Sequence, residues 1–190
     1  MKKNSIKVLF LTAEDTEMEA CHRASLESGV EADCFFSGMG AEATRRKMDG
    51  LELEDYDYVI DVGIAGTYVG APLGSAFNIV EERHGEHPST KYTGAETLFP
   101  WLPSAKGLTY QTMISDRRTV EARRALGAEI ESMEGAAFFE VCIERGVRHF
   151  AELRSVSNEV GETDRGKWNQ PLALDALYEA CRKFLSQLPE

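Results

Sequence analysis

The chain alternates between short continuous runs of apolar residues and longer stretches in which apolar residues recur every three or four positions. Runs of the first kind are typical of buried strands, and the second spacing is typical of amphipathic helices. The pattern predicts strands at residues 6–13, 32–38, 56–66, 75–83, 108–115 and 149–158. It predicts helices at residues 17–28, 41–51, 119–126, 133–145 and 171–188, the last beginning at a proline.

Strands that alternate with helices indicate a fold of the α/β class. We therefore expect a single-domain α/β sandwich over residues 1–190, with a central mixed, mostly parallel sheet flanked by helices. Residues 83–107 break the pattern and contain three of the six prolines. We expect a long loop there, acting as a lid or as an oligomer contact.

Small and polar residues follow five of the predicted strands. They are AEDTE at 13–17, SGMG at 37–40, GIAGT at 63–67, ISD at 114–116 and SNEVGE at 157–162. Turn chemistry explains any one of them. Because ligands in such folds bind at the carboxyl ends of strands, five together favour a pocket at that edge of the sheet.

Charge and composition narrow the class of protein. The net charge of −11 disfavours nucleic acids and anionic membrane surfaces as partners. The opening MKKNSIKVLFLTAEDTE turns acidic after a short apolar run, so we interpret it as a first strand of a cytoplasmic protein, not as a signal peptide. The four cysteines lack zinc-site spacing, and we expect reduced, mostly buried thiols, no metal and no cofactor.

Three motifs occur in an order that carries a resemblance. They are VIDVGIAGTY at 59–68, IESMEGAAFFEVC at 130–142 and LRSVSNEVGETDRGKWNQPLAL at 153–174. Together they resemble the nucleoside phosphorylase/hydrolase superfamily, which includes 5′-methylthioadenosine/S-adenosylhomocysteine nucleosidase, and within it the futalosine hydrolases of menaquinone biosynthesis. The resemblance implies a nucleoside phosphorylase-like fold and cleavage of an N-ribosidic bond through an oxocarbenium-like ribose.

The resemblance assigns roles to two glutamates. Glu17 matches the glutamate that orients or deprotonates the attacking water, although the residues alone favour an acid that stabilises a helix start, a role also open to Glu14 and Asp15. Glu134 matches the glutamate that binds the ribose hydroxyls, with Met133 packed against the sugar. For Glu131 we expect only stabilisation of the helix N-terminus or a solvent-facing position.

Asn158 carries the inference about the leaving base. In adenosine-type nucleosidases the corresponding motif ends in Ser-Asp, and the acid protonates adenine near N7. Here it ends in Ser157-Asn158, and an amide donates and accepts hydrogen bonds at once, which suits a 6-oxopurine. The resemblance therefore implies that futalosine is cleaved to hypoxanthine and dehypoxanthine futalosine. Without it, an Asx turn after the strand explains the residue.

The remaining matches imply substrate contacts. Ile64, Ala65 and Gly66 are expected to line the base, and Gly38 and Met39 match the phosphate-holding loop of phosphorylases. Thr112 and Met113 are expected to touch base and ribose, and Arg154 is expected to orient neighbouring groups. The phosphate-holding loop contains no arginine, which favours water over phosphate as nucleophile. Phe99, Trp101 and Tyr110 are candidates for an aromatic side chain over the base.

Other functions stay open at this point. Two alternatives to futalosine hydrolysis are the hydrolysis of methylthioadenosine or S-adenosylhomocysteine and the phosphorolysis of a purine nucleoside. A shortened middle section also allows an inactive homologue that binds a nucleoside. In each case the expected partners are a purine nucleoside and a second copy of the chain, as a homodimer or higher homo-oligomer.

Overall fold

The computed structural model describes residues 6–189, and within them it contains eight strands and five α-helices. The strands are β1 (Val8–Thr12), β2 (Ala32–Phe36), β3 (Tyr58–Thr67), β4 (Ala76–Arg83), β5 (Lys91–Thr93), β6 (Ser104–Thr109), β7 (Ile130–Ser132) and β8 (Phe150–Glu159). The helices are α1 (Asp15–Ser28), α2 (Ala41–Asp49), α3 (Arg117–Arg124), α4 (Gly135–Glu144) and α5 (Gln170–Ser186). The interpretation of the chain start and the 1–190 domain bounds extend to residues 1–5 and 190, outside the described residues.

The eight strands form one mixed sheet. β1 pairs in parallel with β2 and β3, and β3 pairs in parallel with β8. The pairings run from β3 through β7, β6 and β4 to β8 and back to β3, so five strands close into a ring. Five of the eight pairings are parallel, which confirms the predicted mixed, mostly parallel sheet and the α/β class.

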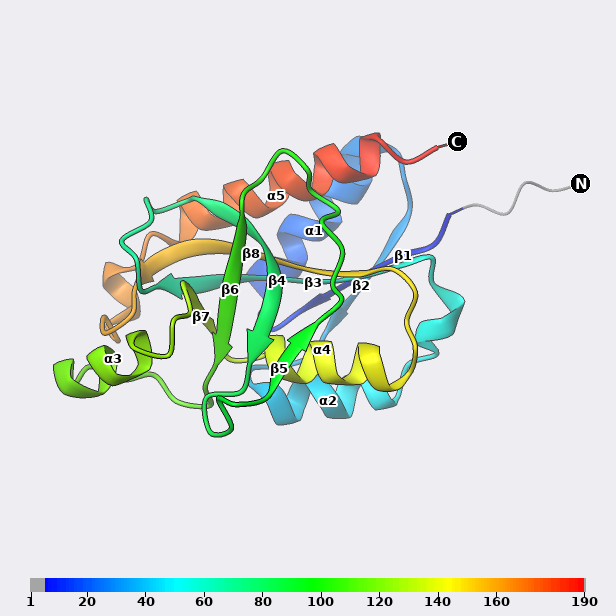
Figure 1. Ribbon diagram of the computed structural model, residues 1–190. Helices are drawn as coiled ribbons and strands as arrows, with labels where there is room; N and C mark the ends of the chain where they lie inside the picture. The colour runs from blue at the N-terminus through cyan, green and yellow to red at the C-terminus, as the bar shows by residue number, and fades with distance from the viewer. Residues whose placement is uncertain (1–5, 190) are drawn as a thin grey trace, which may run out of the picture.

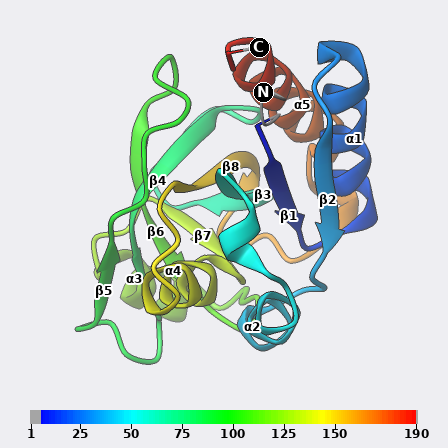
Figure 2. The ribbon, with the colours of Figure 1, turned by 90° about the vertical axis from the view of Figure 1, so that its right-hand side faces the viewer.

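The helices cover the sheet from two sides (Figure 1). α1 packs against α5 on one side, and α2 packs against α4 on the other, as the turned view in Figure 2 also shows. The central strands β1 and β3 are buried over most of their length because helices cover both faces. None of the helices in residues 6–189 is both long and apolar enough to cross a membrane.

The segment predicted as a long loop is more regular than expected. It contains β5 and the first four residues of β6, and the strand predicted at 108–115 ends at Thr109. β5 gives no apolar signal, because Lys91 and Thr93 are exposed on an edge strand. β6 begins with Ser-Ala-Lys-Gly and so gives little apolar signal, and glycine is needed at 107 because a Cβ there would overlap the Glu82 carboxylate.

The segment IESMEGAAFF also divides differently from the prediction. Residues 130–132 form strand β7, which joins β3 to β6, and α4 begins at Gly135 instead of 133. Ser132 Oγ accepts a hydrogen bond from the Gly135 backbone N–H at 3.3 Å, so the chain turns between strand and helix. Met133 and Glu134 lie in that turn, directly before the first residue of α4.

Candidate active site

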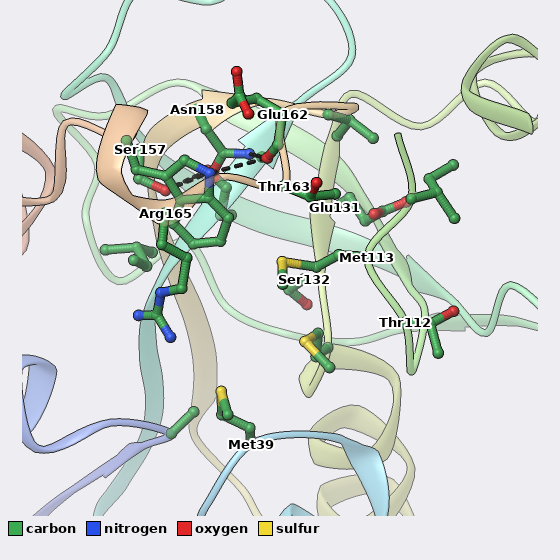
Figure 3. Close-up of a pocket in the computed structure, with 18 of the residues that line it drawn as sticks. Met39, Thr112, Met113, Glu131, Ser132, Ser157, Asn158, Glu162, Thr163 and Arg165 are labelled. Atoms are coloured by element: carbon green, nitrogen blue, oxygen red, sulfur yellow. Dashed lines mark hydrogen bonds between the residues drawn. The ribbon is translucent and has the colours of Figure 1, made fainter. Parts of the chain in front are cut away.

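A cavity of about 550 Å³ opens at the carboxyl ends of β1, β3 and β8, a volume typical of small-molecule sites. Segments that are distant in the sequence meet around it, as the close-up in Figure 3 shows. Ten of the twelve residues predicted for the site line this cavity: Glu17, Met39, Ile64, Ala65, Gly66, Thr112, Met113, Met133, Glu134 and Asn158. The other two, Gly38 and Arg154, lie outside its wall.

Glu17 is held by three backbone donors. Its Oε2 accepts hydrogen bonds from the N–H groups of Ala13 at 3.1 Å and Glu14 at 2.9 Å. Its Oε1 accepts from the N–H of Ile64 on β3 at 2.8 Å. These contacts fix the carboxylate between the end of β1 and the end of β3, although Glu17 belongs to the first turn of α1. Ile64, expected to line the base, thus also orients Glu17.

The protonation of Glu17 is set by competing effects. Burial of the carboxyl raises the pKa of Glu17 to about 7. The hydrogen bond from Ile64 opposes this rise, and the negative charge of Glu134 adds to it. Desolvation disfavours the charged form of an acid. A carboxyl group with this pKa can accept and release a proton near neutral pH, as a general base requires.

Glu134 is a second buried carboxylate in the cavity wall, close enough for its charge to act on Glu17. Its Oε1 accepts from the backbone N–H of Gly40 at 2.8 Å, and its Oε2 accepts from that of Met133 at 3.2 Å. The Gly40 backbone has φ of +92°, a conformation that L side chains rarely adopt, so glycine suits this contact. Only 6% of Glu134 is exposed, which keeps its carboxylate buried at the cavity wall.

Arg154 lies behind Glu134 rather than in the cavity. Its guanidinium donates to Asp61 and, through Nε, to Glu152 Oε1 at 2.7 Å, and its Nη2 lies 3.8 Å from Glu134 Oε2. Burial raises the pKa of both Asp61 and Glu152, and the charge of Arg154 opposes that rise. A Cβ on Gly63 would overlap Arg154 Nη1, so β3 needs glycine where the guanidinium passes.

The structure corrects the interpretation of Glu131. It lies in β7, not at a helix terminus, and its side chain is only 11% exposed. Its carboxylate accepts from Arg123 Nη1 at 3.0 Å and from the hydroxyl of Tyr68. Arg123 also donates to the carbonyl of Thr112 at 3.1 Å. Glu131 therefore anchors the 110–115 segment along the cavity and has no part in stabilising the helix start.

Asn158 organises the turn after β8, as an Asx residue does, and it also lines the cavity. Its Oδ1 accepts from Ser157 Oγ at 2.8 Å, and its Nδ2 donates to the Glu159 carbonyl at 3.0 Å and the Glu162 carbonyl at 3.5 Å. The amide thus organises the turn after β8 while facing the cavity. A Cβ on Gly66 would lie 3.4 Å from Asn158 Nδ2 and 2.9 Å from the Val160 side chain, which explains the small residue beside this turn.

The aromatic side chain at the cavity is Trp168, which the sequence left without a role. Its Nε1 donates to the Glu162 carbonyl at 2.9 Å. Phe99, Trp101 and Tyr110 lie elsewhere: Phe99 is in the core, and Tyr110 packs on Arg123. The feature of the sequence that could have identified Trp168 is its place in the KWNQ motif, directly before Asn169, the N-cap residue of α5.

No protein-family model matches the sequence. The crystal structure of 5′-methylthioadenosine/S-adenosylhomocysteine nucleosidase from Helicobacter pylori superposes with a TM-score of 0.83, covering 98% of this chain and 100% of that chain at 14% identity. The fold is therefore that of the nucleosidase class.

Curated relatives define the family more narrowly. Futalosine hydrolase of Thermus thermophilus is 35% identical over 190 positions, covering 85% of this chain and 80% of that protein. Futalosine hydrolase of Streptomyces coelicolor is 33% identical over 222 positions, covering 93% and 94%. The chain belongs to the futalosine hydrolase family, a group of N-glycosyl hydrolases.

Proposed function

We propose that the protein hydrolyses the N-ribosidic bond of futalosine, an inosine-like nucleoside that carries an aromatic acid, to give hypoxanthine and dehypoxanthine futalosine. The observation that carries the proposal is the convergence of Glu17, Glu134 and Asn158 on one cavity in a member of this family. Each of the three supplies what one part of the bond cleavage needs.

Glu17 takes the proton of the attacking water, because its pKa of about 7 leaves the ionised base well populated at neutral pH. Glu134 accepts hydrogen bonds from the ribose hydroxyls, and its charge stabilises the positive sugar as the bond breaks. Asn158 binds the departing base by exchanging its long 3.5 Å bond to the Glu162 carbonyl for one to the purine.

The two arginines that follow the phosphate-loop position are paired with acids, which disfavours phosphate at that loop. Arg45 donates to Glu140 at 2.8 Å and to Glu144 at 2.6 Å, and Arg46 donates to Glu42 at 2.6 Å. A phosphorolytic site needs a cation for the phosphate oxygens.

The experiment that tests the proposal measures hypoxanthine released from futalosine by the purified protein in phosphate-free buffer. We expect stoichiometric release of hypoxanthine and dehypoxanthine futalosine, unchanged when phosphate is added. Release that requires phosphate would identify a phosphorylase, and binding of inosine without any release would identify an inactive homologue.

Replacing Asn158 with aspartate is expected to shift preference from futalosine toward methylthioadenosine. A carboxyl group can protonate N7 of adenine, whereas the ionised group repels the carbonyl oxygens that Nδ2 now contacts. We expect the ratio of kcat/KM for futalosine to that for methylthioadenosine to fall at least about tenfold. A wild-type protein that already prefers methylthioadenosine would contradict the role given to Asn158.

The proposed enzyme is a single cytoplasmic domain that acts as a homodimer or larger homo-oligomer, without nucleic acid or membrane partners. Exposed apolar side chains in the loop after β3 support the proposed self-association, because Val69 is 59% exposed and Leu73 is 41% exposed.

A further inference from the structure

Arg165 is a basic residue in a cavity wall that is otherwise acidic. The wall includes five glutamates, Glu14, Glu17, Glu131, Glu134 and Glu162, and within residues 6–189 Arg165 is the one lysine or arginine that lines it. It lies in the short 3₁₀ helix of Arg165–Lys167, between β8 and α5. A substrate with a negative group therefore finds its one cationic contact among the described residues of this wall at Arg165.

The other arginines near the cavity are fully engaged. Arg154 is 1% exposed and pairs with Asp61 and Glu152. Arg123 has a 7% exposed side chain, pairs with Glu131 and packs on the Tyr110 ring. Neither guanidinium can reach a ligand without breaking a buried ion pair, which is costly.

Arg165 differs in exposure and in partners. Its side chain is 40% exposed, and among residues 6–189 its hydrogen-bond partner is Glu14 Oε2, at 2.7 Å from Nη2. This single bond leaves Nε and Nη1 as donors toward a ligand. In Figure 3 the guanidinium lies on the side of the pocket toward Met39 rather than beside the Asn158 amide, so it lies away from the proposed base site.

An aromatic surface accompanies this cation. The guanidinium carbon of Arg165 lies 5.2 Å from the centroid of the Trp168 ring, and both side chains line the cavity. Met39 adds an apolar side chain that is 57% exposed. An aromatic ring and a sulfur-containing side chain provide packing for an aryl group, and an arginine beside them binds a carboxylate.

We propose that Arg165 is the residue that selects an aromatic carboxylic acid on the substrate: its guanidinium binds the carboxylate, Trp168 packs on the aromatic ring, and Glu14 holds the guanidinium in position. This inference rests on the proposed function, because futalosine differs from inosine by its aromatic acid. It assigns the preference for the acid to one ion pair, separate from the groups that break the bond.

The test compares futalosine, its methyl ester and inosine on four proteins: wild type, Arg165→Gln, Arg165→Lys and the control Arg182→Gln. Arg182 is a matched arginine on α5, 42% exposed and bound to one glutamate at 2.8 Å. For Arg165→Gln we expect KM for futalosine to rise about tenfold, the effect of losing one charge-assisted pair, with kcat/KM for inosine changed less than about twofold. Arg165→Lys loses less, because charge is kept without the planar fork, and Arg182→Gln matches wild type.

Calorimetric titration separates this inference from the proposed function. The titrations use proteins that also carry Glu17→Gln, because an active enzyme would consume the ligand. With Arg165 present, futalosine is expected to bind about tenfold more tightly than its methyl ester, and with Arg165→Gln both are expected to bind equally. An unchanged preference for the acid in Arg165→Gln, equal losses for inosine and futalosine, or a wild type that does not distinguish acid from ester would overturn the role of Arg165. Absence of turnover with this binding pattern intact would overturn only the hydrolase proposal.

Discussion

Replacing Glu17 with glutamine is expected to lower kcat for futalosine hydrolysis by about 10²–10⁴-fold, the range lost when a general base is removed. The amide cannot take a proton from water, and its NH₂ group would face one of the backbone donors that the carboxylate now accepts from. Steady-state release of hypoxanthine measures the loss. The control is Glu19→Gln, an exposed glutamate on the same helix, and thermal melts check that both variants fold.

The same assignment predicts how the wild-type rate depends on pH. The base works only when ionised, so kcat/KM is expected to fall as pH drops below about 7 and to reach a plateau above it. An acid limb near pH 4.5, the ordinary value for glutamate, would mean that Glu17 is not the titrating base. A Glu17→Gln variant of wild-type activity would exclude it from the chemistry altogether.

Replacing Arg154 with methionine is expected to cost about 3–5 kcal/mol of unfolding free energy, because it leaves Asp61 and Glu152 buried without their cation. For a chain of this size that corresponds to a fall in Tm of about 6–20 °C. The control is Arg182→Met, which removes an exposed ion pair worth about 1 kcal/mol or less.

The loss of unfolding free energy in Arg154→Met is expected to depend on pH. Burial already raises the pKa of Asp61 and Glu152, and removing the arginine raises both pKa values further. Ionising these carboxyls then destabilises the folded state, so the loss is largest at about pH 8 and shrinks toward pH 5, where the acids are neutral. Urea unfolding at the two pH values measures this. A loss that is small, or the same at both, would contradict the buried network.

The sequence predicted which residues meet at the cavity where those residues lie at or near the carboxyl end of a strand. Ile64 and Asn158 lie in the carboxyl-terminal parts of β3 and β8, and Glu17 lies in the first turn of the helix that follows β1. The carboxyl ends of these parallel strands meet at one edge of the sheet. Glu134 was identifiable because its motif is specific. What the sequence could not provide was the set of contacts between distant segments, such as the bond from Gly40 to Glu134 across 94 residues.

The incorrect predictions for Glu131, β5 and β6 also have physical causes. Glu131 was interpreted as a helix acid because β7 has only three residues, too few for an alternating pattern, and its pairing with β3 and β6 is long-range. β5 and the start of β6 were missed because an exposed edge strand and a run of small residues lack an apolar signal. Arg165 became a candidate only when the fold brought it to the cavity and paired it with Glu14.

The most direct test of the account is the ratio of kcat/KM for futalosine to that for methylthioadenosine, measured on the wild-type protein in phosphate-free buffer. We propose that Asn158 selects a 6-oxopurine and that Arg165 with Trp168 selects the aromatic acid, and on these two proposals both ends of the cavity favour futalosine. We predict a ratio of at least about 100. A ratio near one, or a preference for methylthioadenosine, would contradict the account.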